Sequence, residues 1–223
     1  MQSSLPAPVY KPLRLAAPDQ GMRYFARLYE GLDVAPMLAE IEANPELWDA
    51  HPERRIAPGS PHRDMVDIHL RARDRADLAD PDAFRLPHCP IFYPAWRALP
   101  SLHEVVYQLM AASKAVELGN VLLTRIRPGH SIHPHVDPGW AVNWFETKFY
   151  VVLQTNAAVL NFAGEGADEE RVHMAAGSIW RFENRVRHGL DNRGDTDRMS
   201  LIVSVRCSDA VPLHLQQPIE RED

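Results

Sequence analysis

The chain has 223 residues and a formal net charge of −6, and its 45% of hydrophobic residues suffice for the core of one domain. Lys and Arg form no basic run, which argues against a nucleic-acid binder. No stretch approaches the roughly 20 apolar residues of a membrane span, and the first residues lack the apolar region of a signal peptide. Because Cys89 and Cys207 stand far apart and outside any CxxC pair, we expect a reducing, cytoplasmic setting.

The first half of the chain contains few regular patterns. Residues 1–20 hold several prolines and no periodicity, so we expect an irregular arm with at most one short edge strand. Apolar residues recur at helical spacing over 34–44, which predicts a short helix. The polar residues 45–63 predict a structured loop, and the partial alternation of 65–73 predicts a strand. The charged run 73–82 is typical of a solvated connector.

A clearer helical signal follows at S-L-H-E, residues 101–104. In a capping box, the Ser101 hydroxyl bonds to the backbone N–H of Glu104, while the Glu104 carboxylate reaches back to the N–H of Ser101. Apolar residues then recur at helical spacing. The pattern predicts a helix over 102–115.

The second half of the chain changes to short β-rich runs separated by turns such as Pro-Gly. The predicted strands are 120–127, 148–155, 158–162, 171–174, 178–182 and 198–206. Many short strands after a few helices are typical of an antiparallel sandwich or barrel with helices packed on one face, and a jelly roll is the natural candidate. We therefore expect an all-β core with flanking helices in a single domain, 1–223, with the jelly roll over 118–206.

The stretch H-P-H-V-D-P-G-W, residues 133–140, offers candidate metal ligands. His135 and Asp137 are two apart, so on a strand, or at a strand end before the Pro-Gly turn, both can face one metal. A third ligand should come from another strand, and His188 follows a predicted strand. Two imidazoles and one carboxylate on one face of a metal are the ligand set of non-haem Fe(II) oxygenases.

Arg198 and Ser200 stand ten residues or more after His188, on one face of the last predicted strand. A guanidinium is suited to hold the distal end of a dicarboxylate, and a hydroxyl can add a hydrogen bond. Each element alone has an ordinary explanation: a chance tripeptide, a surface histidine, a solvated arginine. Their order along the chain favours a metal site with a co-substrate anchor.

The segment that carries these residues resembles the aspartyl/asparaginyl β-hydroxylase family of Fe(II)- and 2-oxoglutarate-dependent dioxygenases. The resemblance covers about residues 118–206 and lies in the motif I-x-P-G-x-x-I-x-P-H and its spacing to the distal His and Arg. It implies a double-stranded β-helix, which is a jelly roll of the cupin-like type. It also implies His135, Asp137 and His188 as iron ligands, and Arg198 as the partner of the distal 2-oxoglutarate carboxylate.

Further positions are implied by the same resemblance. Lys148 and Tyr150 share one strand face and match positions that contact 2-oxoglutarate in the family. Solvent-facing polar residues on a half-buried strand are an equal alternative. Thr124 is a further candidate for the same contact, whereas Trp180 and Phe182 are assigned to the core.

The implied reaction consumes 2-oxoglutarate and O₂ and yields succinate and CO₂, with hydroxylation of an unactivated C–H bond. The implied substrate is an amino acid, a peptide or a protein side chain, and neither nucleic acid nor membrane is expected as a partner. A vertebrate branch of the family has glycine at the position of Asp137, so the substrate of that branch does not transfer to this chain.

Other assignments remain open. Because His133 lies two residues before His135, the stretch also fits a non-catalytic cupin-like module that holds a metal or ligand through His133, His135 and His188. A Zn or Mn isomerase or hydrolase on the same barrel is a further alternative. The glutamate expected in a cupin comes only at Glu146, so we assign His133 a structural or supporting position.

Two stretches outside the motif are candidate parts of a substrate site. His62 and Arg63 could meet a substrate carboxylate or phosphate, or form a surface turn. The aromatic stretch 139–145 could form a lid or one wall of a cleft, or a loop anchored by its two tryptophans.

Overall fold

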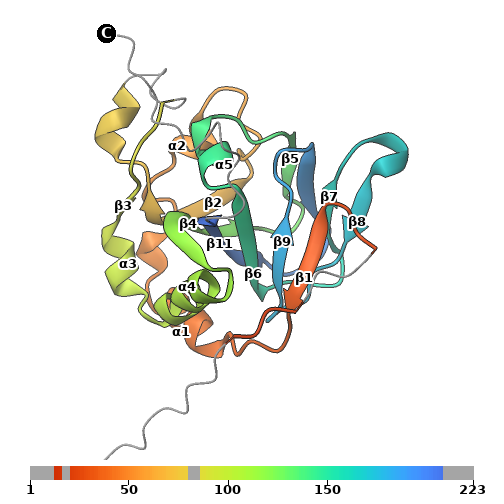
Figure 1. Ribbon diagram of the computed structural model, residues 1–223, viewed down its shortest axis with the longest axis horizontal. Coiled ribbons are helices and arrows are strands. Elements are labelled where there is room, and N and C mark those ends of the chain that lie inside the picture. The colour runs from red at the N-terminus through yellow and green to blue at the C-terminus, as the bar shows by residue number, and fades with distance from the viewer. Residues whose placement is uncertain (1–12, 17–20, 80–85, 208–223) are drawn as a thin grey trace, which may run out of the picture.

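Two antiparallel β-sheets form the centre of the computed structural model, which describes residues 13–16, 21–79 and 86–207 (Figure 1). The larger sheet contains, in spatial order, β1 (Phe25–Tyr29), β9 (Ile179–Phe182), β6 (Thr147–Gln154), β11 (Arg198–Cys207), β4 (Ala115–Ile126), β2 (Met65–Ala72) and β3 (Ile91–Phe92). The smaller sheet contains β5 (Ser131–His135), β10 (His188–Asn192), β7 (Val159–Ala163) and β8 (Glu170–Val172). All these strand pairs are antiparallel, as in a jelly roll.

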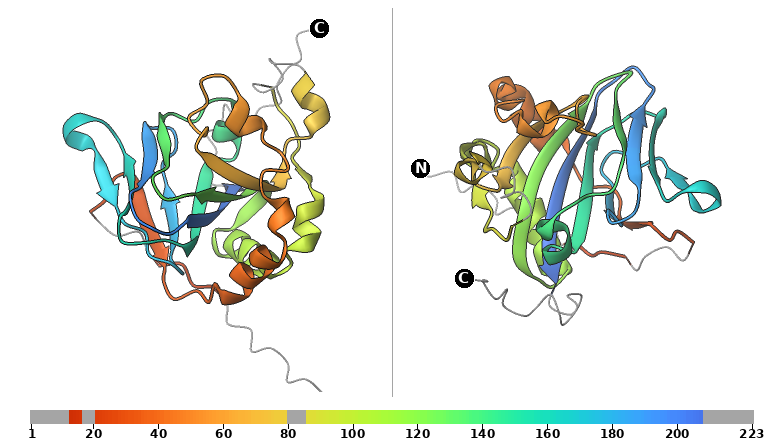
Figure 2. Two further views of the ribbon diagram at one scale, coloured as in Figure 1. Left: turned by 180° about the vertical axis from the view of Figure 1, so that it is seen from behind. Right: turned by 90° about the horizontal axis from the view of Figure 1, so that it is seen from above.

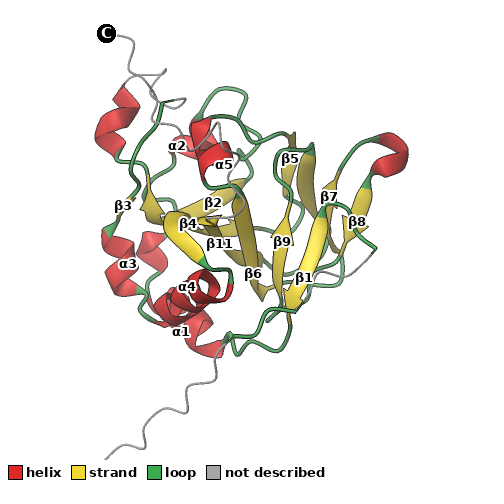
Figure 3. Ribbon diagram, in the orientation of Figure 1, coloured by secondary structure: helices red, strands yellow, loops and turns green. Residues whose placement is uncertain are grey.

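Helices cover one face of the larger sheet, and the smaller sheet lies on the opposite side (Figures 2 and 3). The α-helices are α1 (Ala35–Ala43), α2 (Glu53–Ile56), α3 (Pro94–Ala98), α4 (Ser101–Ala112) and α5 (Trp140–Trp144). Short 3-10 turns occur at Pro45–Leu47, Arg75–Ala79 and Gly166–Asp168. The buried apolar side chains of α1, α3 and α4 share one cluster with the sheet.

Strand β6 shows how the sequence divides between the two faces. Its residues alternate, so successive side chains point to opposite sides. Phe149, Val151 and Leu153 enter the cluster under the helices. Tyr150 and Val152 belong to a second cluster inside the jelly roll. The predicted alternation of the side chains of this strand between two faces is thereby confirmed.

Most predicted elements have an observed counterpart. The predicted all-β core with helices on one face is confirmed, and each predicted strand overlaps an observed one. The helix expected over 34–44 is α1, which buries Met37 and Ile41. Of the expected N-terminal arm, 13–16 lies within the described residues, and Leu13 packs into the helix-covered core. The remainder of 1–20 lies outside the described residues.

Several short elements were not predicted. The sequence of β5 contains Pro134 and that of β10 contains Gly189, both unfavourable in strands, so propensity does not identify them. These two strands form because they pair with each other. The expected loop 45–63 contains α2 and a 3-10 turn.

The predicted capping box is wrong. Pro100 is the residue that caps α4, and Ser101 lies within the first turn, where its hydroxyl donates to Glu40 Oε2 at 2.5 Å. The Glu104 carboxylate instead accepts from Gln108 Nε2 at 2.7 Å. The helix also ends at Ala112 and not at residue 115, because Lys114 adopts a left-handed conformation (φ 56°) that a helix cannot continue.

The charged connector is also only partly as expected. Arg73 is buried, and its Nη2 donates to the carbonyl of Leu86 at 2.8 Å, so this residue is not solvated. A 3-10 turn follows at Arg75–Ala79. The last residues of the predicted connector, from 80 onward, lie outside the described part of the chain.

Candidate metal centre

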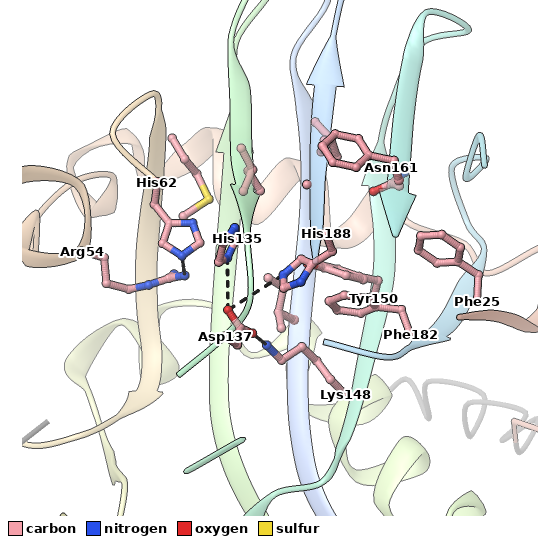
Figure 4. A pocket seen from close by; sticks show the side chains of 16 residues that line it. Phe25, Arg54, His62, His135, Asp137, Lys148, Tyr150, Asn161, Phe182 and His188 are labelled. Carbon is pink, nitrogen blue, oxygen red and sulfur yellow. Dashed lines mark hydrogen bonds and ion pairs between the residues drawn. The ribbon is translucent and has the colours of Figure 1, made fainter. Parts of the chain in front are cut away.

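Strand pairing in the smaller sheet brings two histidines together. His135 ends β5, His188 begins β10, and the two residues are direct partners in the antiparallel ladder. Their ring centroids are 4.3 Å apart. The chain then turns at Gly139, whose φ of 93° suits glycine. This turn follows Asp137, whose carboxylate points back between the two rings (Figure 4).

Both imidazoles are held so that Nε2 faces the carboxylate. The Nδ1 of His135 lies 2.7 Å from the carbonyl of His133, and the Nδ1 of His188 lies 2.9 Å from the carbonyl of Val186. A carbonyl only accepts, so each Nδ1 carries a proton, and the other ring nitrogen, Nε2, faces the carboxylate. This is the arrangement of metal-binding histidines, in which the second ring nitrogen is fixed by a hydrogen bond.

The two oxygens of Asp137 have different partners. Oδ1 lies 3.1 Å from His135 Nε2 and 3.9 Å from His188 Nε2. Oδ2 forms an ion pair with the ammonium of Lys148 and accepts a hydrogen bond from Asn184 Nδ2 at 2.9 Å. Oδ1 is therefore the oxygen that is placed to join a metal, while Oδ2 is held by the protein.

The electrostatics favour an ionised carboxylate at Asp137. Burial works against the charge of Asp137, but Lys148 and the two histidines hold the pKa of this carboxyl well below its usual range. Burial lowers the pKa of His188 to about 4. The site thus offers two imidazole nitrogens and one anionic oxygen, a set that suits a divalent transition metal.

A third histidine lies beside this set. One ring nitrogen of His62, one of His135 and one carboxylate oxygen of Asp137 lie within 4.8 Å of one another, so distance alone groups His62 with them in place of His188. However, the Nη2 of Arg54 lies 3.2 Å from His62 Nε2, and a guanidinium only donates. This bond occupies the His62 Nε2 lone pair, so we consider His188, whose Nε2 is free, the better ligand.

Arg198 lies next to the pocket in an environment without a partner. It is 1% exposed, and burial lowers the pKa of its guanidinium to about 10. Neither Nη1 nor Nη2 has a hydrogen-bond partner among the described residues. The guanidinium carbon lies 5.2 Å from the ring centre of Tyr150, which lines the pocket, although Arg198 itself does not. A buried cation in this state lacks the counter-charge that an anionic ligand would supply.

Two hydroxyls accompany Arg198 on the inner face of the sheet. Ser200 and Thr124 are fully buried cross-strand partners. Thr124 Oγ1 donates to the carbonyl of Ser200 at 3.4 Å, whereas Ser200 Oγ has no partner within the described ranges. Burial raises the pKa of Tyr150 to about 12, so its hydroxyl stays protonated. The predicted anchor residues thus lie close to one another, with donors available.

The pocket itself combines the ligand set with apolar walls. Its lining residues are Phe25, Arg54, His62, Met65, Ile132, His135, Asp137, Lys148, Tyr150, Asn161, Phe162, Phe182, His188, Gly189, Leu190 and Ile202. Phe182 is buried in the core, as predicted, and also forms a pocket wall: its ring lies 4.8 Å from Tyr150 and 5.0 Å from His188. Trp180 is buried in the core, as predicted.

Other candidate residues lie away from the pocket. His133 Nε2 lies 2.8 Å from Asp64 Oδ2, which supports the structural position assigned to it and not a metal-binding HxH pair. Arg63 is exposed, unlike its neighbour His62.

The aromatic stretch 139–145 is anchored by its tryptophans. Trp144 Nε1 donates to Glu117 Oε2 at 3.1 Å, and the Trp140 ring stacks on it at 5.4 Å. The ring of Phe145 packs where a side chain on Gly119 would lie. None of the three lines the pocket. Of the two alternatives, the structure therefore supports the anchored loop.

Two residues that support the site carry no signal in the sequence. Asn184 precedes His188 by four residues in a turn, and Arg54 lies on the short helix α2. Only the three-dimensional structure shows that Asn184 contacts Asp137 and that Arg54 contacts His62. Lys148, by contrast, was predicted as a 2-oxoglutarate contact, and its ammonium is instead seen on Asp137.

Comparison with known proteins gives one family and a set of similar folds. An oxidoreductase of the 2OG-Fe(II) oxygenase family from Burkholderia pseudomallei is 14% identical with a TM-score of 0.54, over 88% of this chain and 95% of that one. A prolyl-4-hydroxylase from Pseudomonas putida is 13% identical with a TM-score of 0.50, over 85% and 95% of the two chains. At these identities the likeness establishes the fold. No curated protein shows significant similarity.

The described helices include none that is long and apolar enough to cross a membrane.

The aspartyl/asparaginyl β-hydroxylase family matches residues 92–207, which is more than half of the chain and includes His135, Asp137, His188 and Arg198. The chain therefore belongs to the aspartyl/asparaginyl β-hydroxylase family.

Proposed function

We propose that the protein is an Fe(II)- and 2-oxoglutarate-dependent dioxygenase that hydroxylates an amino-acid, peptide or protein side chain. The proposal rests on the combination of two features. Two Nε2 atoms and one carboxylate oxygen face one another, and a buried guanidinium beside Tyr150 has two nitrogens that no described residue hydrogen-bonds. A metal-binding module alone would not require the second feature.

The residues fit the iron and its co-substrate. His135, Asp137 and His188 would hold the iron, leaving the side toward the pocket open for other ligands. Arg198, with Ser200 beside it, would bind the distal carboxylate of 2-oxoglutarate, because a dicarboxylate supplies the acceptor that the guanidinium lacks. When bound, iron with 2-oxoglutarate and O₂ would supply the oxidant that hydroxylates an unactivated C–H bond, with release of succinate and CO₂.

The remaining pocket residues would orient the ligands and exclude water. Lys148 and Asn184 hold Asp137 Oδ2, which leaves Oδ1 for the metal. Phe25 and Phe182 form apolar walls beside the site. The choice of an amino-acid or peptide-like substrate rests on the family to which the chain belongs.

The proposal can be tested without a substrate. The protein is mixed with Fe(II) and 2-oxoglutarate in the absence of O₂, and the visible charge-transfer band of the chelated complex is recorded. We expect a band in the wild type, loss of the band in Asp137→Ala, and loss of 2-oxoglutarate affinity in Arg198→Met. Arg206→Met, on the same strand but paired with Glu117 outside the pocket, should keep the band.

The same experiment separates the other functional classes. A folded wild-type protein that binds metal but gives no band would contradict the dioxygenase proposal and favour a cupin-like module or a Zn or Mn enzyme. A band that is unchanged in Arg198→Met would show that Arg198 is not the anchor.

A further inference from the structure

His62 has a hydrogen-bond donor that no described residue accepts. Because Arg54 donates to its Nε2, the neutral ring carries its proton on Nδ1. This Nδ1 is buried and has no partner among the residues that the structure describes. A buried N–H without an acceptor is destabilising, so such groups are rare unless a ligand or water completes them.

The ring of His62 is fixed by a chain of charged groups. Arg54 Nη1 donates to Asp67 Oδ2 at 2.8 Å, while its Nη2 reaches His62. Asp67 is 4% exposed and lies on the inner face of β2. Burial opposes its charge, but His69 and Arg54 hold the pKa of this carboxyl below its usual value. The ionised Asp67 therefore holds Arg54, and Arg54 holds His62 in one tautomer.

The position of His62 limits what its donor can meet. Its ring packs edge-on against His135 with centroids 4.8 Å apart, and Figure 4 shows it on the opposite side of His135 from His188. An acceptor for this ring must therefore be something bound beside His135 and Asp137. In the proposed function, 2-oxoglutarate brings oxygen atoms to this place.

We propose that His62 is a positioning residue that donates its Nδ1–H to a metal-proximal oxygen of 2-oxoglutarate, in a tautomer fixed by Arg54 and Asp67. The inference rests on the proposed function and extends it to two residues, His62 and Arg54, that lie outside the ligand set and the distal anchor. A neutral donor suits this place, because it adds no positive charge beside the metal.

Isosteric variants test the proposal by ligand binding. The amide nitrogen of an asparagine can take the place of Nδ1, and that of a glutamine the place of Nε2. In anaerobic titrations of the Fe(II) protein with 2-oxoglutarate, we expect His62→Gln and His62→Phe to weaken binding by about tenfold or more. His62→Asn should stay within about threefold of the wild type. His130→Asn, an exposed histidine outside the pocket, is the matched control.

Each other outcome is decisive. Equal affinity for 2-oxoglutarate in folded wild type, His62→Gln and His62→Phe would overturn the inference while leaving the proposed function intact. A loss of Mn(II) affinity in His62→Asn comparable to that in His135→Ala would overturn it by making His62 a metal ligand. Absence of the band in the wild type would remove the proposed function itself, and the inference with it. Thermal unfolding of each variant shows whether it is folded.

Discussion

The two faces of the larger sheet are built from the same strands but have opposite character. Toward the helices, Phe149, Val151, Leu201 and Val203 are at most 2% exposed and belong to one apolar cluster. Toward the smaller sheet, polar residues such as Arg198, Thr124 and Ser200 stand beside apolar ones, and some of their atoms have no partner among the described residues. One face thus stabilises the fold, and the other holds polar groups ready for ligands.

The difference shows where free energy is available for function. Unpartnered buried polar atoms such as those of Arg198 and Ser200 destabilise the ligand-free protein. The apolar face can offset this cost, because each large side chain buried there stabilises by about 1.5–3 kcal/mol. Substitutions on the two faces should therefore separate stability from binding.

The largest effect is expected on the apolar face. Phe149→Ala removes a ring that is 2% exposed and leaves a cavity under the helices, so it should lower the free energy of unfolding by about 3–5 kcal/mol. Urea unfolding measures the change. Below the transition, affinity for 2-oxoglutarate should match the wild type; a parallel loss of affinity would break the separation between the faces.

The next-largest expected effect is a change of stability with pH, and it arises from His188 in the pocket. His188 has a pKa of about 4 when folded and about 6.5 when unfolded, so between these values the unfolded state binds more protons. The stability of the metal-free protein should therefore fall as the pH drops from 6.5 to 4, by roughly 3 kcal/mol from this group. His188→Leu should flatten the profile of unfolding free energy against pH. Phe149→Ala should lower that profile without flattening it.

The sequence predicts different features of the two faces, and for different reasons. The alternation of β6 and the helical spacing of α1 predict the apolar face, because burial follows from periodicity. The order of His135, Asp137, His188 and Arg198 predicts the ligand set, since these residues stand at characteristic spacings. Supporting contacts such as that of Asn184 depend on a single turn and leave no periodic signal.

The local predictions that were wrong have a common cause. The capping box at Ser101 has the right letters, but Glu40, 61 residues earlier, competes for the hydroxyl. Likewise β5 and β10 contain poor strand formers and exist because of their mutual pairing. Contacts between residues far apart in the chain override the local pattern in each case.

A moderate effect is expected where the protein holds the metal ligand. Asn184→Ala removes the hydrogen bond to Asp137 Oδ2 and should weaken Mn(II) binding about tenfold to a hundredfold, with little change in stability. Electron paramagnetic resonance of free Mn(II) measures the affinity. Asn143→Ala, at an exposed asparagine, is the matched control, and equal affinities of the two variants would contradict the role of Asn184.

The smallest effect on stability is expected at Ser200. Its hydroxyl is buried without a partner, so Ser200→Ala should change the free energy of unfolding by less than about 1 kcal/mol, or increase it. Its neighbour on the apolar face, Leu201→Ala, should cost about 2–5 kcal/mol. If Ser200→Ala were as destabilising as Leu201→Ala, the contrast between the faces would fail.

The direct pairing of His135 with His188 has an evolutionary consequence. The distance between the two imidazoles is set by one rung of a backbone ladder, so the intervening 136–187 is an excursion that starts and ends at the same place. Within this excursion β6, β7 and β9 are held by their sheet partners, so the loops between them are the parts that can lengthen, shorten or change composition without separating the histidines. Variation in these loops can therefore alter the surroundings of the pocket while the pairing of the two histidines is kept.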